Sequence, residues 1–337
     1  MQKAELRELL EEKIDVDIPR LSQENVASSI AYLSSAEAME SIQVDPYWPK
    51  WNSPWWHSVL LFEIGEAKKI PPEFLDRITT LIDSHYLKFF PFFENEIPPG
   101  KNGSRHIMCH CALGSIEQVL HQAGVDVYGR LPWVRNWYMK YQLADGGLNC
   151  DEAAYTKTIQ KSSVVSTLPP LEAVLNCRNE QWNQDEIVFL ERGANYLIER
   201  KLFRSKSSAD VIDSNWLKLT FPRFYFYDFL RGLNFLVSWS LKTKSKLPLS
   251  SIEESLNILA RLPLGIASAQ YDNLHNSKTL SYRKDASGNE EWIREEASFF
   301  PLLDEARFSK NNSLYLTLKW QEAKDAIAAL LEEKLLI

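Results

Sequence analysis

The chain has 337 residues, 45% of them hydrophobic and 25% charged, so it can build an ordinary globular core as one large domain or two small ones. Its net charge of −7 argues against a general nucleic-acid-binding protein, and the lack of any run of about 18 apolar residues argues against a transmembrane segment. The N-terminus lacks the basic and apolar regions of a signal peptide, and four cysteines do not suggest a disulfide scaffold, so a reducing, cytoplasmic location is expected.

Helical periodicity dominates the chain, and strand-like alternation is scarce. In chain order, the pattern predicts helices over residues 6–13, 22–42, 54–65, 72–90, 105–123, 131–143, 163–176, 184–203, 221–239, 250–262 and 313–335. The Pro169-Pro170 pair predicts a kink or a break in one of them, and residues 282–292 are expected to form a turn region.

Four of the predicted helices are strongly apolar. They begin near residues 54, 105, 162 and 221, about 50 to 60 residues apart, with a more polar helix between each pair. A helix that is apolar all round must be covered on every side or face a cavity. The pattern therefore predicts an all-α fold, an α/α toroid of about five to six helical hairpins with the apolar helices inside. Residues 1–337 would form a single domain, with residues 1–45 as an N-terminal helical extension. An irregular helical bundle would also produce this pattern.

Residues 142–147 and 162–173 carry a family resemblance. The first segment reads Gln-Leu-Ala-Asp-Gly-Gly, and the second is a Ser/Thr-rich start of the next apolar helix. Together they resemble the repeat of terpenoid cyclases and protein prenyltransferase β-subunits, in which a Gln-x-x-Asp-Gly-Gly turn ends an outer helix. Residues 221–233 resemble an inner helix of bacterial proteins related to squalene cyclases. The resemblance extends over residues 51–330 and implies a toroid with an apolar, aromatic central cavity for an apolar, isoprenoid-like small molecule.

The chain also departs from these families. The Asp-x-Asp-Asp motif of class II cyclases and the Asp-Asp-x-x-Asp diphosphate motif are both missing from the sequence. Prenyltransferases hold zinc with an Asp-x-Cys pair and a distant His, whereas this chain has Asn149-Cys150-Asp151 and places its His/Cys segment earlier in the chain. A toroid hosts several chemistries and some non-enzymes, so the resemblance leaves open whether the protein is catalytic.

A zinc site is predicted from His106, Cys109 and His110, whose i, i+3, i+4 spacing would project all three side chains from one helix face. Cys and His are ligands that zinc prefers, and Cys150 or Asp151 would add a ligand from across the Gly turn. Three protein ligands and an open position would give a catalytic zinc that activates a water or a thiol, and lanthionine cyclases resemble this with an adjacent Cys-His pair. The alternative is a buried Cys with two hydrogen-bonded His at a cavity rim.

Candidate catalytic groups are Asp151 and Glu152, with His110 nearby. Two carboxylates close to a helix start would act as general acid and base if burial or mutual repulsion raised the pKa of one of them. The alternative is that both carboxylates cap and stabilise the positive N-terminus of a helix.

Substrate contacts are expected from two segments rich in aromatic and charged residues. The rings near residue 55 would wall an apolar pocket, with core filling as the alternative. The arginines near residue 227 would hold an anionic head group and the aromatic faces would stabilise a cation, with core packing around an Asp–Arg ion pair as the alternative. The residues concerned are Trp55, Trp56, His57, Arg223, Tyr227, Asp228 and Arg231.

Three functional hypotheses follow. The first is an enzyme that acts in a toroid cavity on an isoprenoid-like or thioether-forming substrate, with zinc as its cofactor. The second is a non-catalytic toroid that binds a lipid-like ligand or a protein partner, which the missing cyclase motifs favour. The third is a glycan-acting toroid, which would need two carboxylates in the cavity.

Overall fold

The computed structural model describes residues 3–11, 21–103, 105–177, 181–262, 271–284, 287, 290–308 and 312–337. Over these residues the protein is predominantly helical, and its only sheet is a two-stranded hairpin, so the predicted all-α class is confirmed. Within the described residues, no helix combines the length and the apolar character that crossing a membrane requires.

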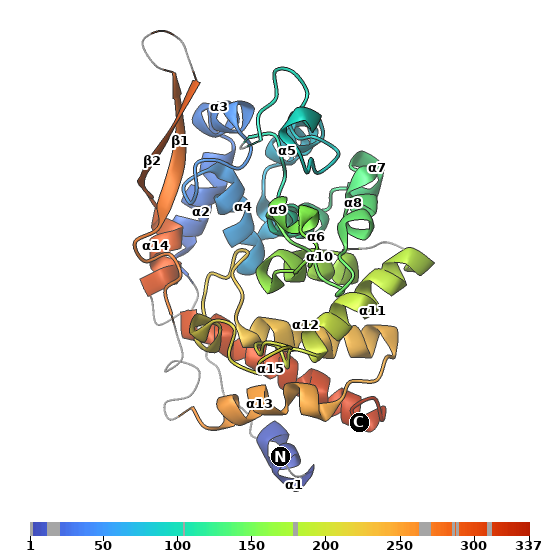
Figure 1. Ribbon diagram of the computed structural model, residues 1–337. Coiled ribbons are helices and arrows are strands. Elements are labelled where there is room, and N and C mark those ends of the chain that lie inside the picture. The colour runs from blue at the N-terminus through green and yellow to red at the C-terminus, as the bar shows by residue number, and fades with distance from the viewer. Residues whose placement is uncertain are drawn as a thin grey trace.

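The helices follow one another along the whole described chain (Figure 1). They are α1 (Lys3–Glu11), α2 (Gln23–Leu33), α3 (Ala36–Val44), α4 (Pro54–Glu63), α5 (Pro72–His85), α6 (His110–Gln122), α7 (Val127–Arg130), α8 (Trp133–Tyr141), α9 (Ala153–Thr156), α10 (Val164–Asn176), α11 (Gln184–Ile198), α12 (Phe229–Thr243), α13 (Leu249–Ala260), α14 (Pro301–Phe308) and α15 (Asn312–Glu332). Short 3-10 helices are η1 (Ala67–Lys69), η2 (Glu94–Glu96) and η3 (Ser214–Leu217), and β1 (Lys278–Lys284) pairs antiparallel with β2 (Glu290–Glu296).

The structure corrects several predicted boundaries. The helix predicted over residues 22–42 is two helices, because the Ser35 side chain accepts the backbone N–H of Ala38 and starts α3. Residues 105–109 and 221–228 precede α6 and α12 instead of belonging to them. Residues 282–292, predicted as a turn region, belong largely to the hairpin, although positions 285–286 and 288–289 lie outside the described residues.

The four apolar helices α4, α6, α10 and α12 are neighbours in that order, and α15 packs along α12 (Figure 1). The α6–α10 contact is the closest, because a Cβ on Gly114 would lie 2.4 Å from the backbone carbon of Pro169. Pro169 and Pro170 both lie within α10, which continues to Asn176. The carboxylate of Glu63, at the end of α4, accepts the backbone N–H groups of residues 223 and 224. The apolar helices therefore form one continuous row of neighbours, whereas the closed toroid of five to six hairpins stays a prediction.

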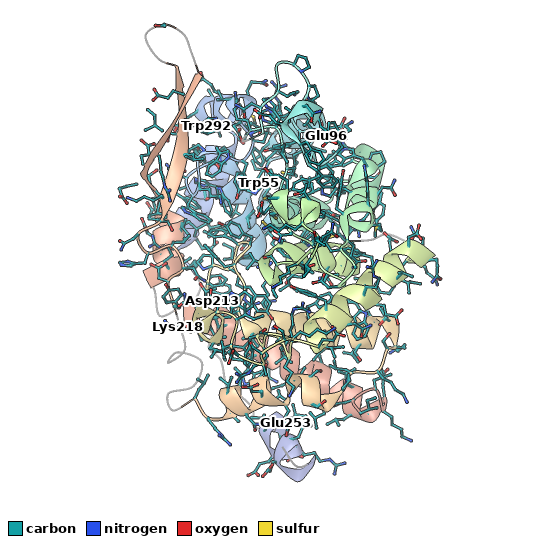
Figure 2. All side chains as sticks on the ribbon, viewed as in Figure 1. Trp55, Glu96, Asp213, Lys218, Glu253 and Trp292 are labelled. Atoms are coloured by element: carbon teal, nitrogen blue, oxygen red, sulfur yellow. The ribbon has the colours of Figure 1, made fainter. Side chains whose placement is uncertain are left out.

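Large side chains fill the space between the helices (Figure 2), and Trp55 lies among the central helices while Trp292 lies on the hairpin. The buried apolar residues form one connected cluster that extends from Leu6 on α1 to Leu330 on α15. Burying a large ring contributes roughly 1.5–3 kcal/mol each, so this cluster is the main stabilising feature of the fold.

A buried network of charged side chains joins α6 to α8 and α11. Nη2 of Arg135 lies 2.6 Å from Oε1 of Glu117, and its Nη1 lies 3.8 Å from Oε1 of Glu186. The hydroxyl of Tyr138 donates to the other oxygen of Glu117 at 2.9 Å. Burial raises the pKa of Glu117, although the adjacent guanidinium opposes that rise.

Removing the cation of this network will destabilise the fold strongly. We expect Arg135→Met to lower the free energy of unfolding by about 3–5 kcal/mol, because Glu117 would remain buried without a charged partner. Urea denaturation measures this change. The control is Arg130→Met, because Arg130 pairs with the exposed Asp76 and its removal should cost at most about 1 kcal/mol. Equal losses in the two variants would contradict the role given to the network.

Candidate metal centre

The Asp145-Gly146-Gly147 turn is a rigid joint between α8, α10 and α11. Oδ2 of Asp145 accepts the backbone N–H of Ser162 at 3.3 Å and lies 3.4 Å from Nη2 of Arg200, and its Oδ1 accepts the Ser162 hydroxyl. Gly146 has φ +92°, and a Cβ there would lie 2.3 Å from the carbonyl oxygen of Arg192. Only glycine fits this position.

Gln142 holds the same joint from the other side. Its Nε2 donates to the carbonyl oxygens of Gly146 at 2.8 Å and of Phe189 at 2.9 Å. The Gln-x-x-Asp-Gly-Gly motif therefore has a structural role, and it sends residues 148–150 along the start of α10. There the backbone N–H of Cys150 donates to Oγ of Ser166 at 3.1 Å.

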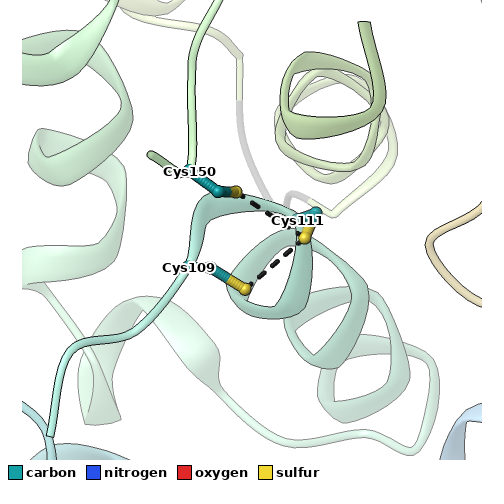
Figure 3. Close-up of side chains that lie close together, drawn as sticks. All are labelled: Cys109, Cys111 and Cys150. Carbon is teal, nitrogen blue, oxygen red and sulfur yellow. Dashed lines mark hydrogen bonds between the residues drawn. The ribbon is translucent and has the colours of Figure 1, made fainter. Parts of the chain in front are cut away.

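This path brings Cys150 to the N-terminus of α6, where two more cysteines lie (Figure 3). Cys109 is the residue that precedes the first turn of α6, and Cys111 lies within that turn. Their sulfur atoms are 3.4 Å apart, and Sγ of Cys150 is 3.7 Å from Sγ of Cys111. All three sulfur atoms lie within 4.8 Å of one another, so this thiol cluster could hold a metal ion.

The groups around Cys109 stabilise its thiolate form relative to its thiol form. The pKa of Cys109 is well below its usual value because the thiols of Cys111 and Cys150 donate hydrogen bonds to it, with a smaller contribution from the charge of Lys50. The hydrogen bond with Cys109 raises the pKa of Cys150 to about 12, and the contacts with Cys109 and Cys150 raise the pKa of Cys111 well above its usual value. The N-terminus of α6 also favours a thiolate at this position, because the helix dipole is positive there.

Lys50 lies in a group of aromatic rings beside the cluster. Its ammonium donates to the hydroxyl of Tyr225 at 3.0 Å and lies 4.7 Å from the centre of that ring. Burial lowers the pKa of Lys50, and the three cysteines oppose this effect. Four more rings lie within 5.9 Å of the same ammonium, namely those of Tyr47, Trp48, Trp51 and Trp56. The rings can stabilise a cation by cation–π contacts while they exclude water.

His110 was expected as a metal ligand and catalytic group, but both of its ring nitrogens are hydrogen-bonded to aromatic side chains instead. Nε1–H of Trp137 donates to Nδ1 of His110 at 2.8 Å, so the proton of a neutral imidazole lies on Nε2, 3.1 Å from the hydroxyl of Tyr155. That hydroxyl accepts the N–H of Asn149 and donates to the carbonyl of Tyr141. Burial lowers the pKa of His110 to about 4. In this arrangement His110 anchors α6 to α8 and to the Gly turn.

The other expected ligand and the two acidic residues also lie away from the cluster. Nδ1 of His106 is 3.0 Å from the backbone nitrogen of Asn102, and its ring stacks on His85 at 4.6 Å. Asp151 and Glu152 are exposed, and Oδ1 of Asp151 accepts the N–H of Ala153 at 3.0 Å. Among the described residues, the group that could hold a metal ion is therefore Cys109, Cys111 and Cys150, and His106 and His110 are not part of it. Asp151 accepts a backbone N–H at the start of α9, as the capping alternative expects, whereas the side chain of Glu152 makes no capping hydrogen bond.

Trp55, Trp56 and His57 at the start of α4 point to different sides of that helix. Trp56 belongs to the aromatic group around Lys50, with its ring 4.4 Å from Trp51 and 5.1 Å from Phe224. The imidazole of His57 points the other way, where it hydrogen-bonds Ser29 at 2.7 Å. Trp55 is fully buried in the core. Of the expected aromatic wall, Trp56 therefore lies beside Lys50, whereas Trp55 and His57 pack in the core.

A cavity of about 420 Å³ is lined by residues of α4, α6, α10, α12 and α15 and of the segment before α12. Arg223 and Arg231 line it, and they face two carboxylates from other helices, Glu63 and Glu172. The predicted Asp228–Arg231 side-chain pair is corrected, because Asp228 accepts the backbone N–H of Arg231 while the guanidinium binds Glu172.

Tyr227 and Asp228 do not line this cavity. The hydroxyl of Tyr227 donates to the carbonyl of Leu202 at 2.7 Å, which ties the segment before α12 to the end of α11. Of the substrate contacts expected near residue 227, the structure therefore places the two arginines at the cavity and the other two residues in the scaffold.

Sequence reasoning missed four residues that the structure brings to these sites. Cys111 and Lys50 belong to the thiol cluster and its surroundings, and Glu63 and Glu172 belong to the cavity. The Cys-x-Cys spacing at positions 109–111 was a readable signal for the first of these. The others lie far apart in the chain and carry no local pattern that would distinguish them from ordinary charged residues.

Comparisons with protein-family models, with curated proteins and with solved structures find no match for this chain. The functional interpretation therefore depends on the geometry of the two sites.

The buried histidines predict acid sensitivity. Burial lowers the pKa of His110 and of His106 to about 4, and that of His57 to about 3, each from an ordinary value of 6.5. The unfolded chain therefore takes up protons below pH 6.5 that the folded chain does not, so the stability present above pH 6.5 falls as the pH drops toward 4.

Urea denaturation between pH 7 and pH 4.5 measures this loss. Between these two pH values, the free energy of unfolding should fall by about 2 kcal/mol less in His110→Gln than in the wild type, because each unit of pKa difference corresponds to about 1.4 kcal/mol. The exposed His275 offers the control variant His275→Gln, which should leave the drop unchanged. A variant at position 110 that retains the full pH dependence would contradict the neutral, buried state of this imidazole.

Proposed function

We propose that the protein is a zinc-dependent enzyme built on an α/α toroid of the terpenoid cyclase and prenyltransferase type, and that it acts on an apolar small molecule. The observation that carries this proposal is the convergence of Cys109, Cys111 and Cys150 within 4.8 Å. Thiolates are preferred zinc ligands, and three protein ligands leave a fourth position open for a water or a substrate.

The surroundings of the cluster support this assignment. Three thiolates and a divalent ion carry a net charge of −1, and the adjacent Lys50 ammonium would neutralise it. Bound zinc would supply a Lewis acid that lowers the pKa of a water or thiol at its open position. The rings of Trp51, Trp56 and Tyr225 would exclude water and provide an apolar surface for the substrate.

Two buried indoles next to the cluster also favour a ligand there. Nε1 of Trp51 and Nε1 of Trp56 are buried and make no hydrogen bond. A buried N–H without an acceptor costs about 1–3 kcal/mol, so an acceptor atom on a bound substrate would remove that cost. The substrate is accordingly apolar in its body and carries an acceptor at the end that meets these indoles.

The alternative is a non-catalytic toroid in which the three cysteines hold a structural metal ion. The exposed positions of Asp151 and Glu152 favour it, because they remove the expected acid–base pair from the cluster. A structural zinc would have four protein ligands and no open position. Cobalt substitution separates the two functions, because exogenous thiols or water-derived ligands change the visible spectrum only where a coordination position is open.

Metal analysis of the purified protein tests the centre itself. We expect about one zinc ion per chain, and its loss in Cys111→Ser and Cys150→Ser, because two thiolates alone hold zinc weakly. The matched control is Cys177→Ser, since Cys177 is a free, buried cysteine outside the cluster. His110→Gln should also retain zinc. A metal-free wild type, or zinc retained after removal of Cys111 and Cys150 in turn, would refute the proposed centre.

A further inference from the structure

A cavity that none of the three cysteines lines is formed by the four apolar helices and by α15. It has a volume of about 420 Å³, which is within the range of small-molecule sites. Ser115, which lines it, lies one helical turn after Cys111, so the cavity begins about 6 Å along α6 from the thiols. Phe224 lines the cavity and packs edge-on against Trp56 at 5.1 Å, so this ring lies between the cavity and the aromatic group around Lys50.

Most of the charged groups at this cavity are already paired. Nε and Nη2 of Arg231 donate to the two oxygens of Glu172 at 2.9 and 2.6 Å, and its Nη1 donates to the carbonyl oxygens of Phe224 and Phe226. Glu63 accepts the backbone N–H groups of residues 223 and 224. These three side chains stabilise the walls, and none of them requires a further partner.

Arg223 is the exception. Its side chain is 11% exposed, and both Nε and Nη2 are buried without a hydrogen-bond acceptor. The nearest carboxylate oxygen, Oδ2 of Asp228, is 3.7 Å from Nε and already accepts the backbone N–H of Thr220. A buried guanidinium N–H without an acceptor is costly, and a carboxylate matches its planar geometry.

The rest of the lining determines what else the ligand must be. Apolar side chains from three inner helices and from the segment before α12 offer a surface for a hydrocarbon or aromatic body; they are Val59, Phe62, Leu175, Phe221 and Phe235. Glu63 and Glu172 would repel a dianion about twice as strongly as a monoanion. Among the cations of the lining, Arg231 and Lys319 are bound to glutamates, and Arg223, with Asp228 3.7 Å away, still has two N–H groups without an acceptor. A singly charged head group therefore fits better than a phosphate.

We propose that this cavity binds an amphiphilic organic carboxylate, with its head group on Arg223 and its apolar body against the phenylalanine and leucine side chains. The proposed site shares no residue with the thiol cluster and does not depend on the metal centre.

Calorimetric titration of the full chain with octanoate tests the proposal. Octanoate should bind, whereas octylamine, with the same apolar body and the opposite charge, and inorganic phosphate, with charge and no apolar body, should bind at least about tenfold more weakly. Arg223→Gln should weaken octanoate binding by about tenfold or more, and the exposed control Arg130→Gln should leave it unchanged.

Two further variants keep the result interpretable. Ser238→Phe fills the cavity from α12 without touching the guanidinium and should abolish binding even if the Arg223 variant folds poorly. Cys150→Ser should lose zinc and still bind octanoate, so failure of the metal centre and failure of this site are distinguishable. Equal binding of octanoate and octylamine, unchanged binding in Arg223→Gln and Ser238→Phe, or no octanoate binding by the wild type would overturn the proposal.

Discussion

The backbone contact between α6 and α10 is the constraint on which both sites depend. It is possible because residue 114 has no side chain, so the two helices meet at a distance that any Cβ would prevent. The contact fixes the position of α6 along the axis of α10. The N-terminus of α6 then lies beside the start of α10, which aligns Cys109 and Cys111 with the chain that carries Cys150.

The Asp-Gly-Gly turn completes this alignment. Asp145 binds the start of α10 and approaches the end of α11, and Gly146 lets the chain pass close to the backbone of α11. The turn contributes no reactive group to the cluster. Its contribution is positional, because the residues after it can reach the α6 N-terminus only along this path. A motif associated with a family of enzymes therefore acts here through geometry.

The thiol cluster and the cavity lined by Arg223 differ in the sign of the charge that they would bind. At the N-terminus of α6, helix dipole, thiol hydrogen bonds and a nearby ammonium gather negative charge on sulfur, which suits a metal cation. In the cavity, paired carboxylates and guanidiniums largely cancel, and the remaining capacity is the donor surface of Arg223. Phe224 contacts the cavity and also Trp56, which belongs to the aromatic group around Lys50. The same apolar helices thus carry both the proposed cation site, at the N-terminus of α6, and the proposed anion site.

The sequence by itself determined the helical class, the four apolar helices and the Gly turn, because hydrophobic period and glycine conformation are local properties. It did not determine the ligand set. The spacing of His106, Cys109 and His110 implies a shared helix face only if the helix begins before residue 106, whereas α6 begins at His110 and the preceding residues are not helical. The hairpin was also missed, because its strands lack the regular apolar alternation that predicts a strand. Tertiary packing decided which cysteines meet, and it alone brought Lys50 and Arg223 to their sites, since long-range contacts leave no period in the sequence.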